Sequence, residues 1–173
     1  RCLEHETGLP LEEVEALAFI TQNPDDFGLP HAAARLHEKL DLPTSVAAFD
    51  ISLGCSGYVY GLTILRGLMR EMGYKKALLV TADPYSKIID RKDRTTSLLF
   101  GDAATVTLLA EGARWNIGKP ILETKGSGWP ALHVNSNSEL VMDGRLVFNF
   151  AVRSVPDQIA KCLNQNGLTQ DDI

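Results

Sequence analysis

Short apolar runs alternate with segments of helical periodicity along the first half of the chain. The runs at 16–21, 46–51 and 76–82 have the length and composition of buried strands. Between them, residues 31–40 and 56–72 carry apolar side chains at helical spacing and are followed by helix-ending residues. Strands that alternate with helices predict an α/β layered architecture rather than a helix bundle or a β-sandwich.

The second half of the chain has a less regular pattern. Residues 103–109 are small and β-branched and predict a strand, and 116–124 is a weaker candidate for another, so this region suits an antiparallel edge of the sheet. Residues 126–137 are rich in Gly, Ser, Asn and Pro and predict an exposed loop. A short strand at 140–142 and a long amphipathic helix at 147–165 follow. The expected buried stripe of this helix consists of Phe150, Val155, Ile159 and Leu163.

The junction between the second apolar run and the second helical segment holds a cysteine, Cys55, after a turn that contains Gly54. A cysteine placed there lies at the first turn of a helix, where unpaired N–H groups and the helix dipole favour the thiolate and can bind an oxyanion. Gly57 and Gly61 leave one face of the helix bare, so that another element can approach closely. The spacing alone also fits a cysteine that simply fills space in the core.

Composition narrows the function classes. The chain has 173 residues, of which 45% are hydrophobic, and this suits one globular domain with a proper core. Its formal net charge of −5 gives no reason to expect nucleic acid or an anionic membrane as a partner. No apolar run approaches a membrane span, and no signal-peptide pattern opens the chain. Three distant cysteines, Cys2, Cys55 and Cys162, argue against a disulfide framework and indicate a reducing cytoplasm.

Three segments in order along the chain resemble the β-ketoacyl-acyl-carrier-protein synthase III family of the thiolase superfamily. Residues 50–62, Asp-Ile-Ser-Leu-Gly-Cys-Ser-Gly and onward, are similar to the family's active-site stretch Asp-x-x-x-x-Cys-Ser-Gly. Residues 93–104 resemble its Asp-Arg…Phe-Gly-Asp-Gly-Ala segment, and residues 142–152 its Met-Asp-Gly…Val-Phe…Ala-Val segment. The likeness covers nearly all of the chain.

The resemblance implies a thiolase-like layered αβαβα fold made of two duplicated halves, each with a mixed five-stranded sheet. An internal echo agrees with a duplication, because residues 8–14 (Gly-Leu-Pro-Leu-Glu-Glu-Val) are matched by residues 167–173 (Gly-Leu-Thr-Gln-Asp-Asp-Ile). We therefore expect residues 1–173 to form a single partial domain, the cysteine-bearing half, with the second half beginning at about residue 167. The chain is expected to be a fragment.

The resemblance also implies a reaction. Cys55 would take an acyl group from acyl-CoA and condense it with a malonyl-acyl-carrier-protein thioester, without a cofactor or metal, in a cytoplasmic homodimer of fatty-acid or related biosynthesis. The family's catalytic His and Asn would fall after Ile173, so the fragment alone is expected to be inactive. Two alternatives stay open: a condensing acyltransferase of secondary metabolism, and a non-catalytic dimerisation subunit of the same fold.

Further site residues are carried over from the family position by position. Phe100 and Tyr85 match walls of the acyl pocket, Leu29 matches a residue that the partner subunit inserts into that pocket, and Arg94 matches an arginine against the adenine end of CoA. Met142, the first residue of the third segment, is also expected to bind substrate. By themselves, Phe100 also fits ordinary core, Leu29 a loop position and Arg94 a surface charge.

The histidines do not suggest a Cys–His protease. All four suit solvated positions, and none lies in a recognisable motif; they are His5, His31, His37 and His133. Two departures from the family pattern, Gly54 before the cysteine and the sequence Gly-Asp-Ala-Ala-Thr at 101–105, favour an acyl donor other than acetyl-CoA.

Overall fold

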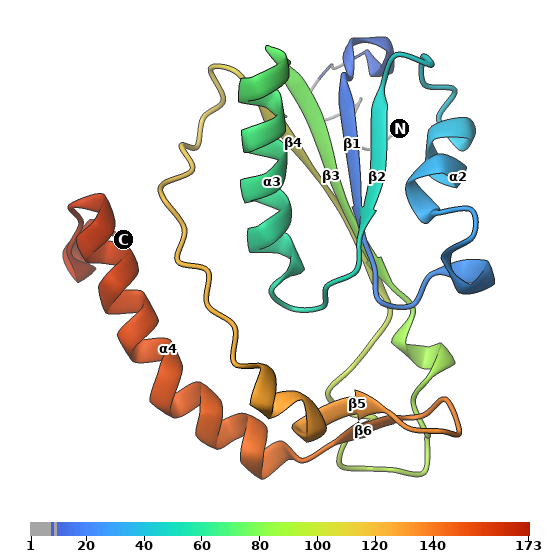
Figure 1. The fold of residues 1–173 in the computed structure, drawn as a ribbon, viewed down its shortest axis with the longest axis vertical. Helices are drawn as coiled ribbons and strands as arrows, with labels where there is room; N and C mark the ends of the chain where they lie inside the picture. The colour runs from blue at the N-terminus through green and yellow to red at the C-terminus, as the bar shows by residue number, and fades with distance from the viewer. Residues whose placement is uncertain (1–7, 9) are drawn as a thin grey trace. The chain divides into compact units, whose positions relative to one another are not determined.

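The computed structural model describes residue 8 and residues 10–173, so Cys2 and His5 lie outside the described part. Within that part, the main sheet has four strands in the order β2-β1-β3-β4 (Figure 1). The first three are parallel, and β4 runs antiparallel to β3 at the edge, as the apolar runs predict. The strands are β1 (Ala16–Ile20), β2 (Ala47–Ile51), β3 (Lys76–Asp83) and β4 (Ala103–Ala110).

Two helices cover opposite faces of this sheet (Figure 1), which confirms the α/β layers. Alternate side chains of β1 serve the two faces: Ala18 packs with Leu65 on the side of α3, and Leu17 packs with Ala33 on the side of α2. β2 alternates in the same way, since Ile51 belongs to the cluster on the α3 side while Asp50 faces α2. The helices are α2 (Ala32–Lys39) and α3 (Gly57–Met72).

Helix α3 lies close against the sheet because two glycines face it. A methyl group placed on Gly57 would lie 2.6 Å from Cγ2 of Ile20, and one on Gly61 would lie 2.6 Å from Cδ1 of Leu79 and 2.8 Å from Cδ1 of Ile20. Real side chains do not approach so closely, so these positions accept only glycine at this packing distance. This confirms the close approach expected from the sequence.

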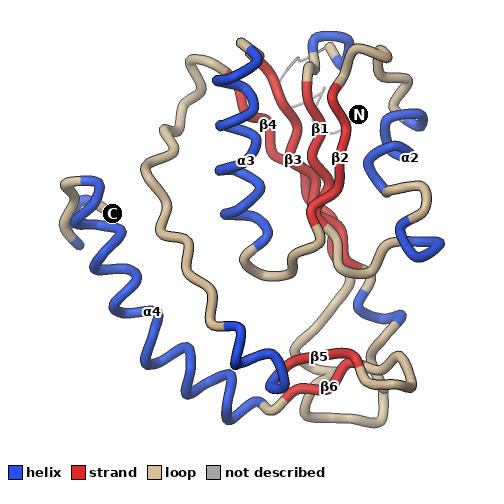
Figure 2. The backbone as a smooth tube through the Cα atoms, in the orientation of Figure 1, coloured by secondary structure: helices blue, strands red, loops and turns tan. Residues whose placement is uncertain are grey.

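The chain divides into two compact units, one formed by residues up to 84 with 102–115, the other by 85–101 with 116–173. The four-stranded sheet, α2 and α3 lie in the first. The second contains a two-stranded sheet, three 3-10 turns and one long helix (Figure 2). Its elements are η3 (Tyr85–Lys87), η4 (Gly126–Ala131), β5 (Leu132–Val134), β6 (Leu140–Met142), α4 (Gly144–Asn166) and η5 (Gln170–Asp172).

Several expectations for the second half need correction. The loop expected at 126–137 contains the 3-10 turn η4 and the strand β5, which pairs with β6. Residues 116–124 are not a strand, so the described part of the main sheet has four strands and not the five that the resemblance implies.

The physical reason lies in where the backbone of 116–124 finds its hydrogen bonds. The side-chain amide of Asn166, at the end of α4, accepts from the backbone N–H of Lys119 at 2.7 Å and donates to its carbonyl at 3.0 Å. The side-chain amide of Gln165 donates to the carbonyl of Pro120 at 3.3 Å, and the Glu123 carboxylate accepts from Lys161 at 2.7 Å. The segment therefore pairs with side chains of α4 instead of a neighbouring strand.

The stripe expected on the long helix is not buried in this chain. α4 has no buried residue; Phe150, Val155 and Ile159 are 46%, 42% and 49% exposed, and Leu163 is half-buried. The helix itself is confirmed, and Asp143 explains its start, because the Asp143 carboxylate accepts from the N–H of Leu146 at 2.9 Å. The amphipathic pattern here indicated a helix but not a partner for its apolar face.

The sequence echo has a structural counterpart. Gly8 and Gly167 both adopt left-handed backbone conformations, with φ of 64° and 66°. A 3-10 turn of three residues begins three residues after each glycine. These turns are η1 (Leu11–Glu13) and η5 (Gln170–Asp172). That a second half begins near 167, and that 1–173 is a single domain, stay predictions. In the part of the chain described, no helix is long and apolar enough to cross a membrane.

Candidate active site

The carboxyl ends of the parallel strands meet at one edge of the sheet, the usual place for ligand sites in α/β proteins. Ile20 at the end of β1 is in register with Ile51 at the end of β2 and with Thr81 near the end of β3. The loops that follow β1 and β2 therefore leave from the same edge. Cys55 belongs to the second of these loops.

Cys55 is an exposed, free thiol on the turn between β2 and α3. The turn is closed by a hydrogen bond of 2.8 Å from the N–H of Gly57 to the carbonyl of Gly54, and the N-cap residue Ser56 already has helical dihedrals. Cys55 thus precedes the cap of a helix of 16 residues, at its positive end. The structure presents this thiol as the sequence predicts; its role as nucleophile remains a prediction.

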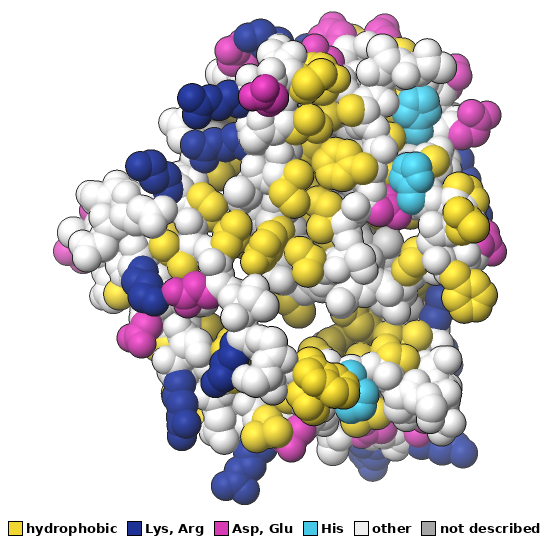
Figure 3. All heavy atoms as spheres, viewed as in Figure 1, with side chains coloured by type: hydrophobic (Ala, Val, Ile, Leu, Met, Phe, Trp, Pro, Cys, Tyr) yellow, Lys and Arg dark blue, Asp and Glu magenta, His cyan; other side chains and the backbone are white. Residues whose placement is uncertain are grey.

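Helix α3 carries apolar side chains on its solvent-exposed face as well as on the face that packs against the sheet. Four of its large apolar side chains are exposed, and apolar side chains gather over this helix in Figure 3. A helix with apolar residues on both sides is typical of one that is covered on both sides. This pattern agrees with the layered fold that the resemblance implies. The four side chains are Tyr58, Val59, Ile64 and Met72.

Asp83, the last residue of β3, fixes the start of the loop that follows β1. One of its carboxylate oxygens accepts from the hydroxyl of Thr21 at 2.9 Å, from the N–H of Gln22 at 2.8 Å, and from the backbone and side-chain nitrogens of Asn23, each at 3.2 Å. Thr21 is 4% exposed, so its hydroxyl needs this acceptor. From the sequence, Asp83 indicates only the end of a strand.

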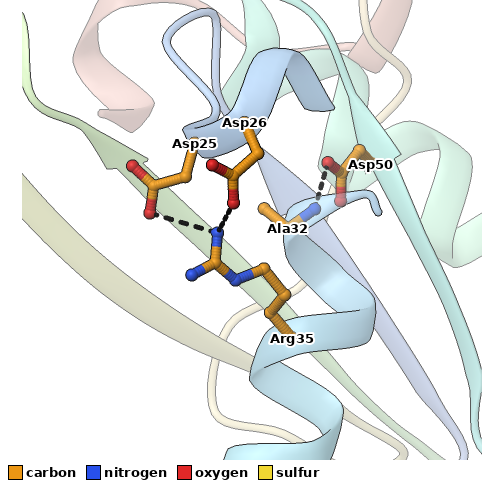
Figure 4. A network of polar contacts seen from close by, with 5 residues as sticks. All are labelled: Asp25, Asp26, Ala32, Arg35 and Asp50. Carbon is orange, nitrogen blue, oxygen red and sulfur yellow. Dashed lines mark hydrogen bonds and ion pairs between the residues drawn. The ribbon is translucent and has the colours of Figure 1, made fainter. Parts of the chain in front are cut away.

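Asp50 fixes the end of the same loop. One carboxylate oxygen accepts from the N–H of Ala32 (Figure 4), the other accepts from the N–H of Ala33, each at 2.7 Å, and both so satisfy the first turn of α2. Asp50 is also the first residue of the Asp-x-x-x-x-Cys stretch. The strand that ends at the Cys55 turn thus also anchors the loop before α2.

The middle of this loop projects two apolar side chains into solvent. Phe27 is fully exposed and Leu29 is 83% exposed. The backbone has positive φ at Asp26, Phe27 and Gly28, with values of 51°, 57° and 77°. This conformation is unfavourable for Asp26 and Phe27, because both carry a Cβ atom. The guanidinium of Arg35 holds the turn, 2.9 Å from the Asp26 carboxylate (Figure 4).

The remaining predicted site residues lie in the second unit. The rings of Tyr85 and Phe100 contact each other with centroids 5.0 Å apart, so the two expected pocket walls are neighbours. Arg94 is exposed, and Met142 is half-buried in β6. Beside Arg94, hydrogen bonds from the side chains of Thr95 and Thr96 and from their N–H groups lower the pKa of the Asp93 carboxyl to about 2. These hydrogen bonds hold the start of the second motif in a tight turn.

The histidines and the second cysteine occupy other places. His37 and His133 contact the backbone carbonyls of Pro43 and Pro130, at 3.0 and 3.1 Å, and His31 is exposed before α2. Cys162 is half-buried on α4, with its sulfur 3.9 Å from the carbonyl of Lys119. Among the described residues, no three His, Cys, Asp or Glu side chains are grouped to hold a metal ion.

Comparison with known proteins shows which family this chain resembles. The family described as 3-oxoacyl-(acyl-carrier-protein) synthase III matches residues 49–126, which include the Cys55 turn. A curated relative named β-ketoacyl-acyl-carrier-protein synthase III, from Oceanobacillus iheyensis, is 34% identical over 97% of this chain and 54% of its own length. Another of that name, from Deinococcus deserti, is 36% identical over 94% of this chain and 49% of its own. The chain belongs to the 3-oxoacyl-(acyl-carrier-protein) synthase III family.

Solved structures of this synthase III family share the fold. A crystal structure titled 3-oxoacyl-(acyl-carrier-protein) synthase III superposes with a TM-score of 0.90, at 32% identity, over all of this chain and 59% of that one. The synthase III of Aquifex aeolicus has a TM-score of 0.89 at 28% identity, over 98% of this chain and 55% of that one. The thiolase-like layered fold is therefore confirmed. The chain spans about half the length of the curated relatives that it matches.

Proposed function

We propose that the whole protein transfers an acyl group from acyl-CoA to Cys55 and condenses it with a malonyl-acyl-carrier-protein thioester, in fatty-acid or related biosynthesis. One observation carries this proposal: the free, exposed thiol of Cys55 lies just before α3, at the carboxyl edge of the parallel strands. The family match across the same turn and the names of the relatives support it.

The chemistry suits that position. The Cys55 sulfur attacks the thioester carbonyl, the C–S bond to CoA breaks, and CoA leaves as its thiol. The malonyl thioester then loses CO₂, its carbanion forms a C–C bond with the acyl carbonyl, and the Cys55 sulfur is released. Each attack produces an oxyanion, which N–H groups at the beginning of a helix can stabilise.

The other site residues take supporting roles in this proposal. The contacting rings of Tyr85 and Phe100 line the acyl chain, and Met142 contacts the substrate. Leu29, exposed on its loop, enters the acyl pocket of a second copy, so that the enzyme is a homodimer. Arg94, also exposed, binds the adenine end of CoA. The enzyme works in the cytoplasm with acyl-CoA and acyl carrier protein, and its chemistry requires no cofactor.

The test is acylation of the whole protein with a panel of acyl-CoAs, followed by peptide mapping of the mass increment. We expect the increment on Cys55, its loss in Cys55→Ser, and no change in the matched variant Cys162→Ser. Addition of malonyl-acyl-carrier-protein should release CO₂ and the condensed product from the acylated enzyme. An increment that persists in Cys55→Ser, or that maps to Cys162, would refute the assignment.

The same experiment addresses the alternatives. Nothing in the names of the curated relatives favours a secondary-metabolite acyltransferase, which would acylate Cys55 but elongate with a different extender. A non-catalytic dimerisation subunit would remain unlabelled by every acyl-CoA while it keeps its fold and its oligomeric state.

A further inference from the structure

The start of α3 has no side-chain cap. Ser56 stands at the N-cap position, but it already has helical dihedrals, with φ of −75° and ψ of −14°, and its side chain makes no hydrogen bond to the first turn. A serine at this position usually accepts from one of the first N–H groups. Without that acceptor, N–H groups of the first turn stay available to an oxyanion formed beside Cys55. The position of the turn then depends on other contacts.

Tyr58, in this first turn, supplies a polar contact to the sheet. Its hydroxyl lies 3.2 Å from the hydroxyl of Thr107 in β4, and either group can donate the hydrogen bond. The inner face of α3 packs on β1 and β3 through Ile20 and Leu79, so this bond reaches past them to the edge strand. Tyr58 follows Cys55 by three residues, which is about one turn of helix.

The bond lies beside the closest approach of α3 to the sheet. Thr107 is in register with Leu79, the residue whose side chain leaves no room for a methyl group on Gly61. Apolar packing there sets how near the helix lies, but it is not directional. A hydrogen bond has a preferred distance and angle. The pair of Tyr58 and Thr107 therefore fixes how far the first turn slides along the sheet and how it is rotated.

We propose that Tyr58 and Thr107 are positioning residues that hold the first turn of α3, and with it the Cys55 thiol, in the geometry that attacks a thioester. This inference rests on the proposed function, in which Cys55 takes an acyl group. It adds that the rate of this step depends on a pair of hydroxyls about one helical turn from the thiol. Both residues act through the turn, so their loss slows acylation without weakening the binding of acyl-CoA.

The test measures single-turnover acylation of Cys55 in the whole protein, with the acyl-CoA that labels it fastest in the panel. Tyr58→Phe and Thr107→Val each remove one hydroxyl and keep the rest of the side chain's shape. Each should lower the maximal rate about tenfold, within the roughly 100-fold that a displacement of about 1 Å can cost. The concentration of acyl-CoA that gives half the maximal rate should stay unchanged. Tyr60→Phe, the same change two residues further along α3, is the matched control and should leave both quantities unchanged.

Two further variants separate positioning from general damage. Thr107→Ser keeps a hydroxyl and should restore most of the wild-type rate. The double variant Tyr58→Phe with Thr107→Val should be no slower than either single variant, because the two hydroxyls form one hydrogen bond. A loss caused by damage at two separate places would instead multiply in the double variant.

The outcomes are distinguishable. Wild-type rates in Tyr58→Phe and Thr107→Val, a higher half-saturating concentration with an unchanged maximal rate, or losses that multiply in the double variant would each overturn this inference and leave the proposed function intact. A loss in Thr107→Val that Thr107→Ser does not restore would also overturn it. A wild-type protein whose Cys55 takes no acyl group from any acyl-CoA would overturn the proposed function, and this inference with it.

Discussion

The two glycines of α3 allow a sharp test of the packing that supports the Cys55 turn. Gly61 faces the sheet, and a methyl group there would lie 2.6 Å from Leu79 and 2.8 Å from Ile20, whose side chains are 0% and 2% exposed. Gly67 lies on the exposed side of the same helix, and a methyl group there would meet no atom within 4 Å. Gly61→Ala and Gly67→Ala therefore add the same methyl group to the same helix, and they differ only in what surrounds that group.

The expected effects have opposite signs. Alanine is favoured over glycine inside a helix by about 1 kcal/mol, so Gly67→Ala should stabilise the protein by roughly that amount. An extra methyl group in a packed core costs about 1–3 kcal/mol, and after the same helix gain Gly61→Ala should destabilise by about 1 kcal/mol. Because the helix term cancels between the two variants, their difference of about 2 kcal/mol isolates the steric cost.

Equilibrium urea unfolding, followed by circular dichroism, measures this difference. With a typical slope of about 1–3 kcal/mol per molar urea, the two midpoints should separate by about 1 M, with Gly67→Ala the higher. If Gly61→Ala stabilised the protein as much as Gly67→Ala, the close contact between α3 and the sheet would be wrong. The placement of Cys55 just before the N-terminus of that helix would then lose its structural support.

Three further predictions concern the anchoring side chains. Asp83→Ala should lower the free energy of unfolding by about 2 kcal/mol, because a buried hydroxyl loses its acceptor; an effect below about 0.5 kcal/mol in the urea midpoint would contradict this. The depressed pKa of Asp93, about 2, means that its hydrogen bonds from Thr95 and Thr96 stabilise the turn above the unfolded pKa and are lost as pH falls through about 2. The protection of the amides in that turn, relative to exchange in an unstructured peptide, should therefore fall towards pH 2, and Asp93→Asn should remove this dependence. Asn166→Ala should speed exchange at the N–H of Lys119 at least tenfold, since that group loses its acceptor; unchanged exchange would mean that the segment is held by other contacts.

The parts of the fold that the sequence predicted well are those set by local patterns. The strands at 16–21, 46–51 and 76–82 were found with bounds within a residue or so, because each is a short apolar run between turn residues. The Cys55 turn was equally predictable, since the strand, the glycine and the helical spacing are all adjacent in the sequence.

The parts of the fold that the sequence did not predict depend on contacts between segments that are far apart in the chain. Residues 116–124 look like a weak strand, but backbone groups of Lys119 and Pro120 are paired by side chains of α4, and no local pattern reveals such a partner. The roles of Asp50 and Asp83 were missed for the same reason. Their acceptor oxygens serve N–H groups that lie 17 and 61 residues away in the chain. The amphipathic pattern of α4 was right about the helix and wrong about burial, because periodicity gives the direction of a face and not what covers it.

The alternation of side chains along β2 restricts how the length of this region can change. Ile51 points into the core beneath α3, and Asp50 points to the first turn of α2. Insertion or deletion of a single residue inside 46–51 would exchange the two faces, placing a carboxylate in an apolar core and removing the acceptor from α2. The same change would move the cysteine turn relative to the loop that holds Leu29. Length variation should therefore be confined to the turn at 41–45, where an added residue alters neither face, and related proteins that differ in length here should differ before the strand and not within it.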